Sequence, residues 1–227
     1  MSVAVQPVKS LSNTQRALQE LRRMIFTGEL SGGSDHLESE LAERLGMSRT
    51  PVREAALTLE SQGLLEMRPR KGVRILPVSP EDMREIYEIL TELESLAAER
   101  AALSKPGADD LVQLEAAIAD MDAALAAEDR EAWAAADDLF HSELVRLGGN
   151  ARAAAIVGMM GDQVRRAKAS TLYIRPLPTQ SNDDHREVLD AIRRGDAGAA
   201  RLLHRAHRER AREMIVSLLE RHRLSSL

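Results

Sequence analysis

The chain has 227 residues, of which 44% are hydrophobic and 30% are charged, a composition typical of a globular protein that buries a sizeable core. It contains no cysteine, which excludes disulfides, thiolate catalysis and cysteine-ligated zinc. The sequence shows neither an apolar run of signal-peptide length at its start nor a membrane span. We therefore expect a cytoplasmic protein with no membrane partner.

The formal charge of −5 is distributed unevenly along the chain. Residues 1–78 contain 11 Lys and Arg against 9 Asp and Glu, whereas the rest of the chain contains 20 against 27. A strongly acidic segment is poorly suited to lie on phosphate. The distribution therefore places any nucleic-acid contact in the first part and favours ligand sensing or dimerisation in the second.

The first part of the chain begins with a segment expected to form a flexible tail, residues 1–11. A helix is predicted over residues 14–27, because Leu18, Leu21 and Ile25 fall on one face, and Gly28 ends it. A loop follows at residues 32–34.

Two short helices joined by a tight turn are predicted next. Leu37, Leu41 and Leu45 lie four residues apart and give the first helix one apolar face. Gly46 supplies the left-handed residue that ends this helix, and Ser48 is placed to cap the second. This arrangement is a helix-turn-helix pattern.

The second of these helices carries two outward cations. Pro51 stands near its start, where the missing N–H costs little, and Arg49 and Arg53 lie one turn apart, opposite the apolar face. A helix of this kind fits the major groove of DNA, and arginine can bind guanine or phosphate there. The alternative interpretation is an ordinary solvated basic face, which is common for such pairs.

A basic β-hairpin is predicted directly after this helix. Residues 64–67 and 73–76 have the pattern of short strands, and the turn between them contains Arg68, Arg70 and Lys71. Such a hairpin is typical of the wing of a winged helix-turn-helix, whose cations reach phosphates or the minor groove. Gly72 would allow a close approach of the backbone.

Residues 40–73, ELAERLGMSRTPVREAALTLESQGLLEMRPRKGV, resemble the DNA-binding domain of the GntR family of bacterial transcription regulators. The resemblance extends over residues 14–76, and SRTPVREA is its most specific part. It implies that Arg49, Thr50, Arg53 and Gly72 contact double-stranded DNA, with the wing residues Arg70 and Lys71 beside them. Ser39 stands where some relatives have a base-contacting arginine, so their half-site preference cannot be transferred.

The second part of the chain is predicted to be entirely helical. Ser79 is a helix cap, Pro80 a first helical residue, and acidic residues follow, so we place the domain boundary between residues 78 and 79. Alanine-rich helices with few aromatic residues favour a closely packed antiparallel bundle. The expected helices cover residues 81–103, 108–127, 130–147, 151–170, 183–194 and 196–221. The predicted fold is therefore mainly α, with a winged helix-turn-helix domain at residues 12–78 and an all-helical domain at residues 79–227.

A candidate metal site is distributed over three of these helices. Asp137 and His141 lie four residues apart and share a face. His185 and His207 lie 10 and 12 residues on either side of Gly195, which is roughly 15 and 18 Å from that turn, so a hairpin would bring them level. Taken singly, each residue is more often a surface or core residue. Packed together they would suit Zn²⁺, Ni²⁺, Mn²⁺ or Co²⁺.

A second resemblance concerns this part of the chain. Residues 137–141 (DDLFH), 149–150 (GN) and 185–189 (HREVL), together with Asp196 and His207, are similar to the FCD ligand-sensing domain of the FadR subgroup. The resemblance implies a divalent metal held by Asp137, His141, His185 and His207. His204, one turn from His207, is left as a neighbour.

The resemblance also implies a small organic-acid effector beside the metal, and Asn150, Arg165 and Arg166 are the candidate effector-binding residues. Leu90 stands where many relatives have an arginine that holds such an acid, four residues before Glu94. The expected protein is a homodimeric transcription regulator that binds a pseudo-palindromic operator, and repressor activity is usual in the family. The alternatives are a regulator with a structural or signalling metal and no organic effector, and a metal-dependent hydrolase, for which no separate general base is identified.

Overall fold

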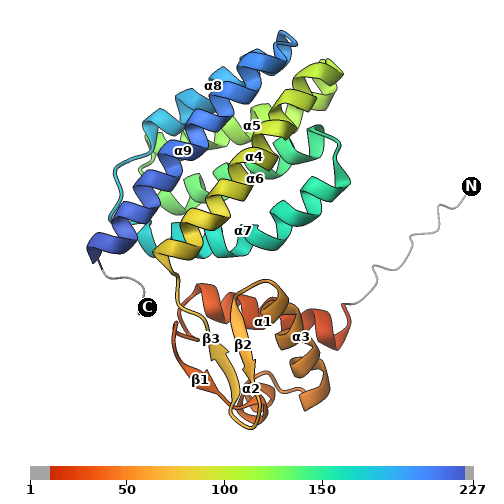
Figure 1. Cartoon of the computed structure of the whole chain (residues 1–227), viewed down its shortest axis with the longest axis vertical. Helices are drawn as coiled ribbons and strands as arrows, with labels where there is room; N and C mark the ends of the chain where they lie inside the picture. Colours follow the sequence, from red (N-terminus) through yellow and green to blue (C-terminus); the bar gives the residue numbers. More distant parts are fainter. Residues whose placement is uncertain (1–10, 223–227) are drawn as a thin grey trace, which may run out of the picture. The chain divides into compact units, whose positions relative to one another are not determined.

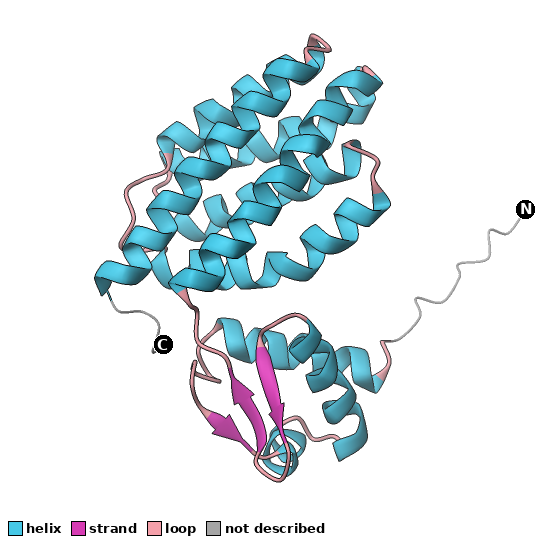
Figure 2. Ribbon diagram, in the orientation of Figure 1, coloured by secondary structure: helices cyan, strands magenta, loops and turns pink. Residues whose placement is uncertain are grey.

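Figures 1 and 2 show a computed structural model of the chain, which describes residues 11–222. The expected flexible tail of residues 1–11 therefore lies, apart from Leu11, outside the described residues. The chain divides into two compact units between Pro77 and Val78. Within the described range, none of the helices combines the length and the apolar character needed to cross a membrane.

In the first unit, residues 11–77 form three helices and a small antiparallel sheet, which confirms the predicted winged helix-turn-helix (Figure 2). Its elements are α1 (Asn13–Phe26), β1 (Asp35–His36), α2 (Glu38–Arg44), α3 (Arg49–Ser61), β2 (Leu65–Arg68) and β3 (Gly72–Ile75). The strand order is β1-β3-β2. The sequence does not predict β1, because two residues are too few to carry an alternating pattern.

The apolar faces of these helices and strands meet in one core, which includes Leu21, Leu41, Leu59 and Ile75. Gly46, with a φ of +62°, makes the left-handed turn between α2 and α3, as predicted. Ser48 occupies the N-cap position of α3, but its side chain makes no capping hydrogen bond. Ser48 is exposed, so water can satisfy its hydroxyl and the free N–H groups of the first turn.

The second unit is an all-helical bundle, as the sequence predicts. Its helices are α4 (Pro80–Ser104), α5 (Ala108–Ala126), α6 (Arg130–Leu147), α7 (Ala151–Thr171), α8 (Thr179–Arg193) and α9 (Ala197–His222). Figure 1 shows the long helices α4 and α9 lying side by side, and α8 folds back onto α9 at Gly195. The bundle core includes Leu114, Met121, Trp133, Phe140 and Val188.

Helix α8 begins four residues before the predicted start at Asp183. Its first turn, from Thr179 to Asn182, contains no apolar residue, so hydrophobic periodicity cannot reveal it. This turn nevertheless packs into the bundle, because Asn182 is buried and accepts a hydrogen bond of 2.7 Å from the indole N–H of Trp133.

The end of α6 lies unusually close to α4. A Cβ atom at Gly148 would lie 2.7 Å from the Cα atom of Ala97, so a larger residue would separate the two helices. Arg100 closes the same junction by donating a 2.6 Å hydrogen bond to the carbonyl oxygen of Gly148. This close packing positions His141, on α6, beside Glu94, on α4.

Candidate functional site

A groove in the first unit lies between the start of α3 and the β2–β3 hairpin. It has a volume of about 410 Å³, and its lining includes Arg49 and Arg53 from α3 and Arg68, Arg70 and Gly72 from the hairpin. Helix and hairpin therefore present their cations toward the same space. The sequence predicts that these cations lie on the same side, because a basic hairpin directly follows the helix that carries Arg49 and Arg53.

The cations around this groove differ in how they are neutralised. Arg53 is 60% exposed and forms an ion pair of 3.0 Å with Glu38. Arg68 pairs with Asp35 and Glu66 and is thus tied to the sheet. Within residues 11–222, by contrast, Arg49, Arg70 and Lys71 form no ion pair, and all three are exposed, as is Thr50. These residues can reach phosphate or base edges without first breaking a contact.

Gly72 has a structural role in addition to the predicted DNA contact. Its φ is +87°, and a Cβ atom there would lie 2.2 Å from the backbone oxygen of His36. Replacing Gly72 by alanine is therefore expected to destabilise the first unit by about 1–3 kcal/mol, through backbone strain and the clash with β1. Urea unfolding of the full-length variant measures this change.

The matched control for this prediction is Gly46→Ala. Gly46 also has a positive φ, of +62°, but a Cβ atom added there would meet nothing within 4 Å. The control therefore contains the backbone strain without the clash. Equal destabilisation by the two substitutions would show that the clash with His36 contributes nothing to the destabilisation caused by Gly72→Ala.

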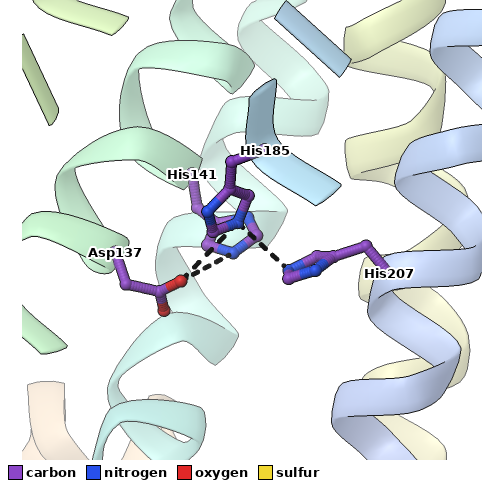
Figure 3. A group of neighbouring side chains, drawn as sticks. All are labelled: Asp137, His141, His185 and His207. Carbon is purple, nitrogen blue, oxygen red and sulfur yellow. Dashed lines mark hydrogen bonds and ion pairs between the residues drawn. The ribbon is translucent and has the colours of Figure 1, made fainter. Parts of the chain in front are cut away.

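The second site lies inside the helical bundle and contains the four predicted metal ligands. Asp137 and His141 come from α6, His185 from α8 and His207 from α9, and all four are buried. Figure 3 shows the carboxylate and the three imidazole rings turned toward a common point. One donor atom from each residue lies within 4.8 Å of the other three.

The distances inside this cluster are short. Oδ1 of Asp137 lies 3.7 Å from Nε2 of His141 and 3.6 Å from Nε2 of His185. Nε2 of His185 lies 3.2 Å from Nε2 of His207 (Figure 3). The same ring nitrogen of each histidine therefore faces the centre, and the level placement expected on either side of Gly195 is present.

Carboxylates hold the opposite side of two of these rings. Nδ1 of His141 lies 2.9 Å from Oε2 of Glu94, and Nδ1 of His207 lies 3.1 Å from Oδ2 of Asp184. When Nδ1 of such a ring carries the proton, Nε2 keeps a lone pair, and in both rings Nε2 faces the centre. Such carboxylate–imidazole pairs are the usual outer partners of metal-binding histidines.

The second oxygen of the Asp137 carboxylate has its own partner. Nζ of Lys168 lies 2.6 Å from Oδ2 of Asp137, so Oδ1 is left to face the imidazoles. Burial favours a raised pKa for Asp137, but the positive charge of Lys168 holds its pKa well below the ordinary value. Asp137 is therefore an anion at neutral pH.

Burial also favours the neutral form of two of the cluster's histidines. It lowers the pKa of His185 and of His207, and the neighbouring imidazoles lower it further for His185. Neutral imidazole is the form that binds metal ions. Lone pairs and a carboxylate that converge without a cation between them repel one another, so this donor set fits a divalent ion.

A cavity of about 430 Å³ adjoins the cluster. Its lining contains apolar side chains, among them Leu90, together with His141 of the cluster, the cations Lys168 and Arg208, and the carboxylates of Glu94 and Asp138. Leu90 is buried in this wall, so the position for which the sequence resemblance implied an arginine in relatives carries an apolar side chain here. The cavity suits a small molecule with both apolar and anionic groups.

The predicted effector-binding residues lie in different surroundings. Arg165 lines the 430 Å³ cavity but pairs with Asp138 and Asp162, at 3.0 Å each. Arg166 is buried and does not line this cavity. Asn150 caps α7 by accepting hydrogen bonds from two backbone N–H groups, and it too lies outside the cavity lining.

Several charged residues of the site are not predicted from the sequence. Lys168 and Arg208 are buried, and Arg208 pairs with Glu94 at 3.4 Å. Glu94 also lies 3.6 Å from His204, which joins His141 in a second group with ligand geometry. These residues come from helices far apart in sequence, and no local spacing identifies them; only the helical position of His204, one turn from His207, offered a signal.

Comparison with known proteins places this chain in a family. The family model for "Bacterial regulatory proteins, gntR family" matches residues 13–75, and the model for the "FCD domain" matches residues 85–210. The chain belongs to the GntR family of bacterial transcription regulators. Members of this family are DNA-binding regulators and not enzymes, which removes the support for a hydrolase.

Individual GntR-family relatives agree with this assignment. A transcriptional regulator of Streptomyces ambofaciens is 31% identical over 86% of this chain and 82% of its own length. A "Probable D-xylose utilization operon transcriptional repressor" of Paenarthrobacter nicotinovorans is 33% identical over 76% of this chain and 75% of its own. The crystal structure of a GntR regulator from Rhodococcus sp. RHA1 superposes with a TM-score of 0.74 and 25% identity, covering 91% of this chain and 99% of that one.

Proposed function

We propose that this GntR-family regulator is a homodimeric repressor whose helical unit binds a divalent metal ion and a small organic acid. The observation that carries the proposal is the buried cluster of Asp137, His141, His185 and His207 beside a 430 Å³ cavity. Three imidazoles and one carboxylate suit Zn²⁺, Ni²⁺, Mn²⁺ or Co²⁺. The cations at the cavity suit an acid.

Each residue of the cluster has a distinct task in this proposal. Asp137, His141, His185 and His207 would hold the ion, which would supply a positive charge for an acidic group of the effector. Lys168 orients the Asp137 carboxylate through its 2.6 Å contact, and Glu94 and Asp184 fix the rings of His141 and His207. Leu90 and the neighbouring apolar side chains exclude water from the body of the effector.

The proposed output is a change in operator affinity. In a homodimer, two copies of the α3–hairpin surface would bind the halves of a pseudo-palindromic operator in the bacterial cytoplasm. An effector changes this affinity only if it binds one arrangement of the dimer better than the other. Repression as the mode of regulation is supported by the repressor name of the Paenarthrobacter nicotinovorans relative, and relief of repression by the effector is part of the proposal.

The proposal is tested on operator binding itself. Full-length protein is loaded with metal and bound to a DNA fragment that it selects from genomic DNA, and small organic acids are then added singly. We expect at least one acid to change the apparent affinity by about 5- to 150-fold, the usual range for coupling between sites. Fluorescence anisotropy of the labelled fragment measures the change, and chelator-treated protein is the control.

The second candidate is a regulator whose metal is structural or is itself the signal. It is favoured by the burial of all four donor residues within the bundle. In that case a chelator lowers the melting temperature strongly, while no organic acid shifts the melting temperature of the loaded protein or its DNA affinity. Acid-dependent shifts in loaded protein would exclude it.

A further inference from the structure

Arg175 is a buried cation without a carboxylate partner. It lies between α7 and α8, is 4% exposed, and its Nε and Nη2 atoms have no hydrogen-bond partner within residues 11–222. Its guanidinium lies 5.4 Å from the ring centroid of Trp133. Burial lowers the pKa of Arg175, which is the direction expected for a cation removed from water.

An unpaired buried guanidinium is costly, because its donors lose water without gaining acceptors. Arg175 lines a small cavity of about 20 Å³ that is also lined by Asp137, His141 and His207 of the proposed metal site. The same cavity is lined by Tyr87, whose buried hydroxyl likewise has no partner among the described residues. The Nε and Nη2 groups of Arg175 and the hydroxyl of Tyr87 therefore lie beside the metal-site residues without an acceptor among the described residues.

The buried cations around this space differ in their carboxylate partners. Lys168 is paired with Asp137 at 2.6 Å and with Asp138 at 3.1 Å, and Arg208 is paired with Glu94 at 3.4 Å. The charge of Arg175 has no such partner among residues 11–222, and a divalent ion would add two further positive charges. Arg175 is therefore the buried cation beside this space that has no carboxylate partner within residues 11–222, and a carboxylate of the ligand, distinct from one at the metal ion, would supply that partner.

We propose that Arg175 and Tyr87 bind a second carboxylate of the effector, and that the effector is therefore a compact dicarboxylate. This inference rests on the proposed function and specifies the class of its ligand. The 20 Å³ cavity has room for roughly one water-sized group, so one end of an acid group enters it. The body of the ligand occupies the 430 Å³ cavity, which shares His141, Lys168 and Arg208 with the smaller one.

Tryptophan fluorescence can report on a carboxylate bound at Arg175 and Tyr87, the subsite proposed here. Trp133 is the single tryptophan of the chain and lies directly beside Arg175. Metal-loaded full-length protein is titrated with two pairs of acids that differ by one carboxylate, succinate with propionate and malate with lactate. We expect the dicarboxylates to change Trp133 emission and to bind at least about 10-fold more tightly than their partners, as a charged hydrogen-bond pair implies.

The variants test the residue assignment. Arg175→Gln is expected to weaken dicarboxylate binding about 10-fold or more and to leave monocarboxylate binding unchanged. Arg175→Lys is expected to retain part of the affinity for dicarboxylates, because lysine keeps the positive charge but lacks the planar guanidinium that binds a carboxylate through two hydrogen bonds. Arg152→Gln, an exposed residue of α7 outside both cavity linings, is the matched control. Isothermal titration calorimetry on the same samples confirms the affinities independently of the tryptophan signal.

Two results would overturn the inference: no response of the wild type to either dicarboxylate, or equal affinities of the wild type and Arg175→Gln. Inorganic phosphate acting as strongly as malate would overturn the assignment to a dicarboxylate. Elemental analysis of metal content, made on each sample after titration, reports on the proposed function separately. A protein that binds no metal but shows Arg175-dependent binding of malate would contradict the proposed metal site and retain this subsite.

Discussion

Replacing His141 and His207 together by alanine is expected to abolish stoichiometric metal binding. The two substitutions remove half of the donor set, and the remaining Asp137 and His185 leave too few ligands for a transition-metal ion. Elemental analysis of the purified variant should find no metal where the wild type holds about one ion per chain, the value expected for a single four-donor site.

The same substitutions should remove the stability that metal confers. An ion that binds only the folded chain stabilises it by about 4 kcal/mol when its free concentration is a thousand times the dissociation constant. Adding and removing metal should therefore shift the melting temperature of the wild type and not that of the double variant.

His222→Ala is the matched control, because His222 is exposed at the end of α9. Circular dichroism verifies that the double variant is folded, and Asp137→Asn, which keeps the shape of the side chain, provides a second test. Metal retained at the wild-type level by the folded double variant would place the ion elsewhere.

Replacing Arg53 by alanine is expected to weaken operator binding by about 1–3 kcal/mol, or roughly 5- to 150-fold, if its guanidinium binds a base. Arg53 lines the groove between α3 and the hairpin, and its pair with Glu38 holds it there in the free protein. Arg53 is 60% exposed in this pair, so its guanidinium can turn from Glu38 to a base of the bound DNA.

Binding is measured on a selected operator fragment and on unrelated DNA at one fixed salt concentration. A residue that reads a base reduces the preference for the operator, whereas one that grips phosphate weakens both complexes equally. Arg221→Ala, at the exposed end of α9, is the control. An unchanged operator affinity would remove Arg53 from the DNA-binding surface.

The sequence predicts the fold almost completely, because the fold depends mainly on local patterns. Gly46, Ser79 and Pro80 mark the helix ends, and apolar spacing marks the buried faces. The exceptions have a common cause. The two-residue strand β1 and the first turn of α8 have no periodic pattern, and only packing against distant residues defines them.

The candidate metal site could be predicted only in part. Asp137 and His141 are linked by helical spacing, and His185 and His207 by their distances from Gly195, so topology and resemblance together indicate the set. The residues that surround it depend on tertiary packing. Lys168, Arg175 and Arg208 are buried cations that a sequence pattern cannot distinguish from the many solvated ones.

Helix α4 gives the ligand state of the bundle a direct mechanical route to the start of the helical unit. Glu94, which contacts both His141 and Arg208, lies 14 residues from Pro80, or roughly 21 Å along a continuous helix. Pro80 in turn follows the last residue of β3, Ile75, by only a few residues of chain. If a ligand displaced Glu94, as the proposed function implies, the displacement would act on the same continuous helix whose first residue, Pro80, directly follows the chain segment that leaves the first unit.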